Sequence, residues 1–270
     1  MTSGVVLWLW VAGLVYFVLG LIAVRKELRF SNLPVLGRAF APLGLGMFGA
    51  EHLSAPRVLA EGVPKWMPAH LFWSYLVGFA LIAAATSIAL NRFARLAASL
   101  LGLMFILFVL MIHGPNVVAN PHNRFLWAVA TRETAFACGA LIFARRFPAL
   151  CRIALGLVLV FFAVEHFLHP EFIPGVPLGK LTPEFIPARE LWGYVTGLAL
   201  LTGGAALLVN KYVRSATTLL GMVLIAMVVF LYLPILAAHP KDLVEALNYI
   251  GDTSLFAGLI LLASQSSKDS

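Results

Sequence analysis

Charged residues are scarce in this chain, and their scarcity excludes a soluble globular fold. Only 11% of the 270 residues are Asp, Glu, Lys or Arg, whereas 61% are hydrophobic, and the mean hydropathy is +0.94. A soluble domain of this length has too little interior to hide that much apolar surface. We therefore expect a membrane protein whose main partner is the lipid bilayer.

Cysteines are rare, and the familiar catalytic motifs are absent. Cys138 lies in an apolar run and Cys151 in a short basic loop, so we expect them to be poorly placed to pair. The stretch "LTGGAA" lacks the lysine of a phosphate-binding loop, and no nucleophile elbow is present. No two histidines have the i,i+4 spacing of helical metal ligands, so haem or metal binding is not expected. These absences leave open whether the protein is an enzyme.

Apolar runs of about 20 residues recur along the chain, which is the length that crosses a hydrocarbon core as a helix. The first run is too long for the core of a signal peptide and has no basic residue before it, so we expect a retained anchor. The predicted fold is an all-α polytopic bundle with about nine spans, near 4–24, 36–53, 71–90, 96–113, 126–144, 153–168, 191–209, 215–235 and 250–264.

Basic residues lie in short clusters between the spans, which points to membrane topology rather than to nucleic-acid binding. The formal net charge is +7. With the N-terminus outside, 12 of the 19 basic residues fall on the inner side and 7 on the outer side. Lys and Arg are enriched in cytoplasmic loops. We therefore expect the N-terminus outside and the C-terminus in the cytoplasm, in a bacterial inner membrane as the default location.

An internal repeat is visible at a constant offset of 119 residues. It aligns Trp73 with Trp192 and Asn91 with Asn210, and further aligned pairs are Pro68 with Pro187, Gly102 with Gly221, Pro115 with Pro234, Pro121 with Pro240 and Thr134 with Thr253. Upstream the offset falls to 114, where Glu51-His52 matches Glu165-His166. The repeat predicts two similar units.

Each unit contains four spans, so both units enter the membrane from the same side and form parallel repeats. The predicted organisation is an N-terminal anchor with a basic inner loop at 1–33, a first four-helix repeat at 34–147, and a second repeat with a short tail at 148–270. Proline-rich outer loops at 54–70 and 169–190 are expected to cap the bundle.

Several motifs resemble those of the DoxX-like membrane proteins. They are "GMFGAEHL" and "FFAVEHFLHP", then "LFWSYLVGFAL" and "LWGYVTGLAL", then the turns "NRFAR" and "NKYVR". The resemblance covers about residues 34–264. It implies a four-helix unit and a role beside a redox or thiol-handling membrane system, since the family takes its name from a subunit associated with a thiosulfate:quinone oxidoreductase. This chain differs from a typical member by having two units and an additional first span.

Ionisable residues at the outer ends of the spans are the candidate site. A charge buried in hydrocarbon is costly, so such groups face the bundle interior or a cavity. The candidate polar pocket consists of Glu51, His52, His113, Arg132, Glu133, Glu165, His166, Arg189, Glu190 and Asp252. The other interpretation is that these residues are partly wet at the headgroup level and mark helix ends or hold the two copies together.

The leading functional hypothesis is a membrane component of a redox system that binds quinone, or a similar hydrophobic molecule, near the outer face. The Glu51-His52 and Glu165-His166 pairs would relay protons, and a redox protein would be the partner. Two other classes stay open. A small-molecule transporter suits the parallel duplication, and a non-catalytic assembly or chaperone subunit suits the absence of a cofactor motif.

Overall fold

Helices make up most of the computed structural model, which describes residues 3–175, 180–238 and 243–267. Eight of the helical segments are long and apolar enough to cross a membrane. The ninth predicted span lies in α12, which has 24 residues. No strand occurs in the described residues, where one isolated bridge joins Phe172 to Leu181. The predicted all-α transmembrane bundle is thus confirmed.

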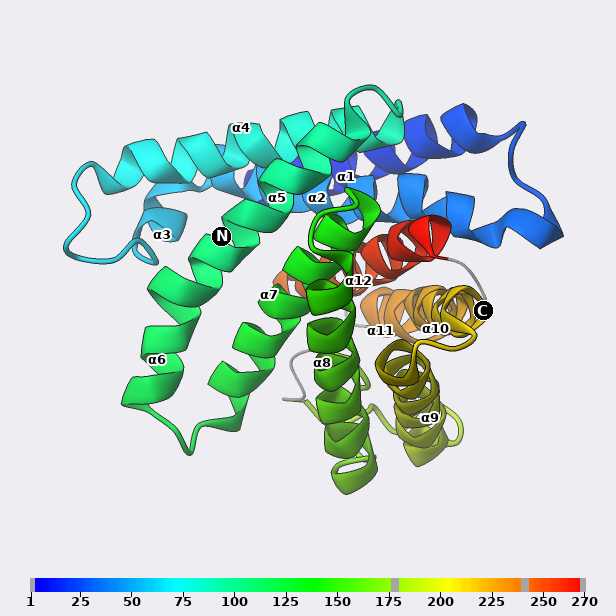
Figure 1. Ribbon diagram of the computed structural model, residues 1–270. Coiled ribbons are helices and arrows are strands. Elements are labelled where there is room, and N and C mark those ends of the chain that lie inside the picture. Colours follow the sequence, from blue (N-terminus) through cyan, green and yellow to red (C-terminus); the bar gives the residue numbers. More distant parts are fainter. Residues whose placement is uncertain (1–2, 176–179, 239–242, 268–270) are drawn as a thin grey trace.

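Most of the helices follow one another with short connections, whereas longer loops precede α4 and α9 (Figure 1). Their bounds are α1 Ser3–Val24, η1 Phe30–Leu36, α2 Gly37–Ser54, α3 Pro56–Ala60, α4 His70–Ala89, α5 Ala94–Phe108, η2 Val109–His113, α6 Gly114–Ala119, α7 Arg124–Phe143, α8 Pro148–Leu168, α9 Arg189–Val209, α10 Val213–Met227, η3 Val228–Tyr232, α11 Leu233–Ala238 and α12 Leu243–Ser266.

The duplication is visible in the element bounds themselves. The run α5, η2 and α6 recurs as α10, η3 and α11 at an offset of 119 residues at every boundary, and α7 and α12 begin 119 residues apart. The same offset relates the left-handed residues Ala69 and Ala188, and also Asn91 and Asn210. Because a positive φ is uncommon for residues other than glycine, these matches show that the turns as well as the helices are duplicated.

The fourth predicted span extends further than expected. The fourth span was predicted to end near residue 113, but the helix continues through η2 into α6 and ends at Ala119. η2 is a π-helical turn in which the N–H of Gly114 bonds to the carbonyl of Val109. This turn restarts the helix, so Pro115 falls in the first turn of α6, where its missing N–H costs little.

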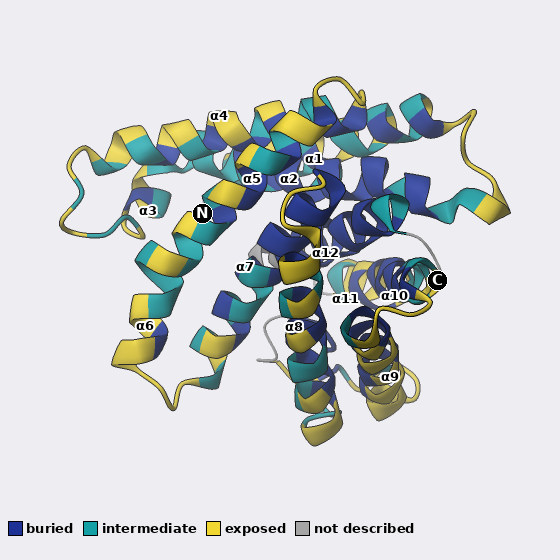
Figure 2. Ribbon diagram, in the orientation of Figure 1, coloured by how far each residue is buried: buried dark blue, intermediate teal, exposed yellow. Residues whose placement is uncertain are grey.

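The last of the four membrane-spanning helices in each repeat packs on the other repeat. These fourth helices are α7 in the first repeat and α12 in the second. α7 packs against α8, and α12 packs against α2, while α7 and α12 also pack against each other. In the described part of the chain, α7 makes no contact with α2, the first helix of its own repeat. Figure 2 shows α12 as largely buried from residue 249 onward and α4 with one exposed face. The two repeats therefore share one core.

Glycines let α2 and α12 approach each other closely. A Cβ on Gly37 would lie 2.7 Å from the carbonyl oxygen of Gly258, and one on Gly44 would lie 2.5 Å from that of Gly251. A Cβ on Gly258 would overlap the backbone of Ala41. Small residues at helix contacts are the usual route to tight packing in a membrane, where the hydrophobic effect does not drive helices together.

The two cysteines contradict the expectation that they are poorly placed to pair. Both are free thiols and both are buried, but the side chains of Cys138 on α7 and Cys151 on α8 interact directly. Residues 144–147 form the short turn between these antiparallel neighbours. A short turn between two antiparallel helices places residues just before it and just after it at a similar distance from the helix ends. The positions of the two cysteines in the sequence did not reveal this.

Candidate functional site

A buried charge cluster lies where the two fourth helices meet. Nη1 of Arg132 on α7 is 2.5 Å from Oδ2 of Asp252 on α12, and Nη2 is 3.3 Å from Oε1 of the adjacent Glu133. Glu133 and Asp252 are each 7% exposed. One positive group thus lies between two carboxylates, and the pair with Asp252 joins the first repeat to the second.

Two further predicted residues belong to the surroundings of this cluster. Glu51 near the end of α2 interacts electrostatically with Asp252, and His113 at the end of η2 interacts electrostatically with Arg132. The guanidinium of Arg132 also lies 5.8 Å from the ring centre of Phe136. Charged groups from both repeats therefore surround Arg132.

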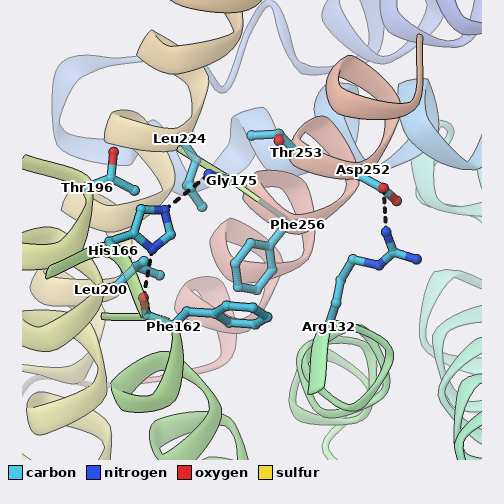
Figure 3. A pocket seen from close by; sticks show the side chains of 10 residues that line it. All are labelled: Arg132, Phe162, His166, Gly175, Thr196, Leu200, Leu224, Asp252, Thr253 and Phe256. Carbon is cyan, nitrogen blue, oxygen red and sulfur yellow. Dashed lines mark hydrogen bonds and ion pairs between the residues drawn. The ribbon is translucent and has the colours of Figure 1, made fainter. Parts of the chain in front are cut away.

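His166 lies in a separate polar position on α8. Its Nδ1 is 2.6 Å from the carbonyl oxygen of Phe162, and its Nε2 accepts a hydrogen bond from the N–H of Gly175 at 3.1 Å. In the view of Figure 3, the rings of Phe162 and Phe256 lie between this imidazole and the ion pair of Arg132 with Asp252. The histidine and the charge cluster thus line one cavity from different sides.

The internal cavity is too small for an organic ligand. Its volume is about 10 Å³, which is the space that a single water molecule needs. Nε of Arg132 and Oε2 of Glu133 have no hydrogen-bond partner among the described residues. The cluster is thus built to hold charges together and to accommodate water, whereas a quinone ring would not fit beside it. This corrects the expectation of one shared ligand pocket.

An open groove of ligand size lies near the start of α7 and the end of α8. Its volume is about 380 Å³, and its lining residues are His122, Arg124, Trp127, Phe161 and Glu165. Nε of Arg124 lies 3.4 Å from Oε2 of Glu165. The groove therefore combines two flat aromatic groups with an ion pair between the two repeats. We call it the outer groove, because the topology predicted from the basic residues places it on the outer side.

The loop before α9 contacts residues of both the outer groove and the internal cavity. The Arg124 guanidinium lies 5.1 Å from the ring centre of Phe172, a residue of this loop. Gly175 follows in the same loop and contacts His166, and the hydroxyl of Tyr232 donates a hydrogen bond to the carbonyl of Pro174. The predicted capping role of the second outer loop agrees with these contacts.

The remaining predicted residues are not drawn into either site. His52 uses Nδ1 to contact the carbonyl oxygen of Phe48 at 2.8 Å. Arg189 and Glu190 are exposed in the first turn of α9. His239 and Pro240 lie outside the described residues. Two residues that are adjacent in the sequence belong to different sites, because Glu165 lines the outer groove whereas His166 lines the internal cavity.

Comparison with known proteins gives one partial match. Residues 42–119 match the model of a domain of unknown function, DUF8561. This segment runs from α2 to the end of α6 and leaves out α7 and the entire second repeat. No curated protein and no solved structure matches the chain. In the described residues, no group of three or more His, Cys, Asp or Glu side chains is arranged to hold a metal ion.

Sequence reasoning missed Tyr232, which is 2% exposed. Its hydroxyl accepts a hydrogen bond from Oγ1 of Thr253 at 3.3 Å and contacts the outer loop through Pro174. A signal was present, because the 119-residue offset aligns Tyr232 with His113, a residue that had been singled out. Both residues end a π-helical turn. Because histidine and tyrosine differ chemically, the equivalence of the two positions was not noticed in the sequence.

Proposed function

We propose that this protein is a membrane component of a redox system that binds a quinone, or a similar small hydrophobic carrier, in the outer groove. The observation that carries the proposal is the groove itself, at about 380 Å³ between α7 and α8. Small-molecule sites have volumes of about 300–1,000 Å³ and combine apolar walls with a few polar groups. The groove meets both conditions, whereas the internal cavity of about 10 Å³ is far below this volume.

The groove residues suit the chemistry of a quinone. Trp127 and Phe161 offer flat apolar faces for the ring. Quinone carbonyl oxygens are hydrogen-bond acceptors, and His122 and Arg124 supply N–H donors. The guanidinium of Arg124 carries five N–H groups in a planar fork, and it lies beside Glu165 at 3.4 Å. In this arrangement Arg124 orients the carbonyl end while the aromatic residues hold the ring.

A hydrophobic carrier would reach the groove from the bilayer. Phe125 on α7 and Leu157 and Val164 on α8 are exposed apolar residues, at 53%, 58% and 47%. They lie on the same two helices as the groove residues. A lateral opening to lipid is suitable for a molecule with an isoprenoid tail, because the tail can remain in the hydrocarbon while the ring is bound.

The redox assignment rests on the motif resemblance to DoxX-like proteins, which also motivates a redox protein as partner. In that scheme the partner reacts with the carrier at the outer face. The buried cluster around Arg132 has a structural role in this scheme, because its ion pair with Asp252 holds the two repeats together. We place the protein in a bacterial inner membrane with the N-terminus outside.

Cysteine labelling tests this orientation. In a chain without Cys138 and Cys151, Lys65→Cys should react with a membrane-impermeant maleimide added to intact cells, whereas Arg92→Cys should react only after the membrane is opened. Both positions are exposed, and they lie on opposite sides of the α4 span. Labelling of Arg92→Cys alone from outside would reverse the proposed topology.

Photolabelling tests the outer groove. A photoreactive ubiquinone analogue should label residues of α7 and α8 in purified protein in lipid nanodiscs, and excess ubiquinone should compete. Trp127→Leu should reduce labelling about tenfold or more, because it removes one aromatic wall. Trp73→Leu is the matched control, since both indoles donate to a proline carbonyl oxygen at 2.9 Å but Trp73 is not part of the groove. Equal labelling of both variants would contradict the assignment.

A further inference from the structure

Two buried cysteines lie on neighbouring helices, at the opposite end of the α7 and α8 pair from the outer groove. Cys138 is 6% exposed and Cys151 is 5% exposed, and their side chains interact directly. Sγ of Cys151 also lies 3.8 Å from the carbonyl oxygen of Arg146 in the turn between the helices. Each thiol belongs to a different repeat, so the contact spans the boundary between the two copies.

The duplication supplies an internal comparison for these positions. The offset of 119 residues aligns Cys138 with Ala257, and the offset of 114 aligns Cys151 with Gly37. In the equivalent contact α12 packs against α2, and a Cβ on Gly37 would meet Gly258 and Leu262 of α12. Helix packing at this interface therefore does not require sulfur. The interface that has cysteine has it on both sides, which points to the chemistry of a thiol pair rather than to filling space.

We propose that Cys138 and Cys151 form a redox-active dithiol whose oxidation links α7 to α8, and hence the first repeat to the second. The oxidant is a quinone dissolved in the membrane. In this reaction two S–H bonds break and one S–S bond forms, while two electrons and two protons pass to the quinone oxygens and give a quinol. Disulfide exchange with a dithiol reductant reverses the link through a mixed disulfide.

The burial of the pair suits this chemistry. Thiols that are shielded from water are also shielded from soluble thiols such as glutathione, which keep accessible cytosolic cysteines reduced. A membrane-dissolved oxidant approaches from the lipid side, where Leu150 and Ile153 on the first turns of α8 are exposed at 68% and 44%. The inference goes beyond ligand binding in the outer groove, because it concerns other residues at the other end of the two helices.

The test is a count of free thiols in the full-length protein in nanodiscs. After incubation with a fully substituted short-chain ubiquinone and denaturation, maleimide labelling should fall from two thiols to none. The intact mass should fall by about 2 Da, as expected for the loss of two hydrogens, and dithiothreitol should restore both thiols. Cys138→Ala and Cys151→Ala should each keep one reactive thiol throughout. Alanine already occupies the position equivalent to Cys138, so the first of these variants should fold.

Persistence of both thiols under the quinone would overturn the proposal, and so would a quinone adduct or a disulfide between two chains. Diamide, a small membrane-permeant oxidant, separates two causes of persistence. Closure with diamide alone would show that the pair can form but that quinone is not its oxidant. Trp127→Leu should still form the disulfide, so failure of groove binding and failure of the dithiol are distinguishable.

Discussion

Arg132→Leu should lower the free energy of unfolding by about 3–5 kcal/mol, the cost typical of breaking a buried ion pair from one side. The substitution leaves Asp252 and Glu133 buried without their counter-charge, at the contact between the two repeats. Reversible unfolding in detergent or bicelles measures the change. A lower yield in the membrane should accompany it, while the helical content of the surviving protein should not change.

Arg124→Leu is the matched control for this experiment. It also removes the arginine of an ion pair, in this case the pair of Arg124 on α7 with Glu165 on α8. The Arg124 side chain is 34% exposed, however, and its separation from Glu165 is 3.4 Å. Exposed ion pairs are worth about 0–1 kcal/mol. In the double variant Arg132→Leu/Asp252→Leu part of the lost stability should return, because fewer charges stay buried. Equal effects of the two single arginine variants would contradict a buried inter-repeat ion pair.

Gly258→Ala should destabilise the protein by about 3 kcal/mol or more, since the added methyl group meets backbone atoms that cannot move aside. The new Cβ would overlap the backbone of Ala41, where α12 of the second repeat crosses α2 of the first. The two helices would have to separate, and the fourth helix would lose its place in the shared core. Thermal unfolding and membrane yield should both decrease.

Gly251→Ala on the same helix provides the comparison. There the nearest atom to the new methyl is Cζ of Phe48 at 3.3 Å, and the next is the end of the Met47 side chain at 3.6 Å. Such side-chain atoms can shift, so the cost should be below about 1.5 kcal/mol. Both changes raise intrinsic helix propensity equally. Similar stability of the two variants would refute the close packing of α12 on α2.

Periodicity and the repeat predicted the helices well, because span length and duplication are properties of the sequence itself. The matched turns at Asn91 and Asn210 could be placed without coordinates, and so could the convergence of Arg132 with Asp252. A charge in a bilayer must find a partner, and the duplication placed both residues at the same depth.

The exchange of fourth helices could not be predicted from the same signals. An apolar span can pack equally well on its own repeat or on the other one, and the choice depends on close contacts such as that of Gly258 with Ala41. The expected ligand pocket failed for a related reason. Phe162 and Phe256 occupy the space between His166 and the charge cluster. Whether a side chain fills such a space depends on the direction in which it points, and the spacing of residues in the sequence does not give that direction. Arg189 and Glu190 are exposed in the first turn of α9, because a charged residue at a helix end does not need to be buried.

The most direct test of the proposed function is the quinone content of the protein purified from its own membrane. Lipid extraction and mass spectrometry should find about one quinone per chain in the wild type and in Trp73→Leu, but far less in Trp127→Leu, as expected for one outer groove per chain. A wild-type preparation with no more quinone than its co-purifying phospholipid carries in bulk membrane would contradict the account, as would an equal content in Trp127→Leu.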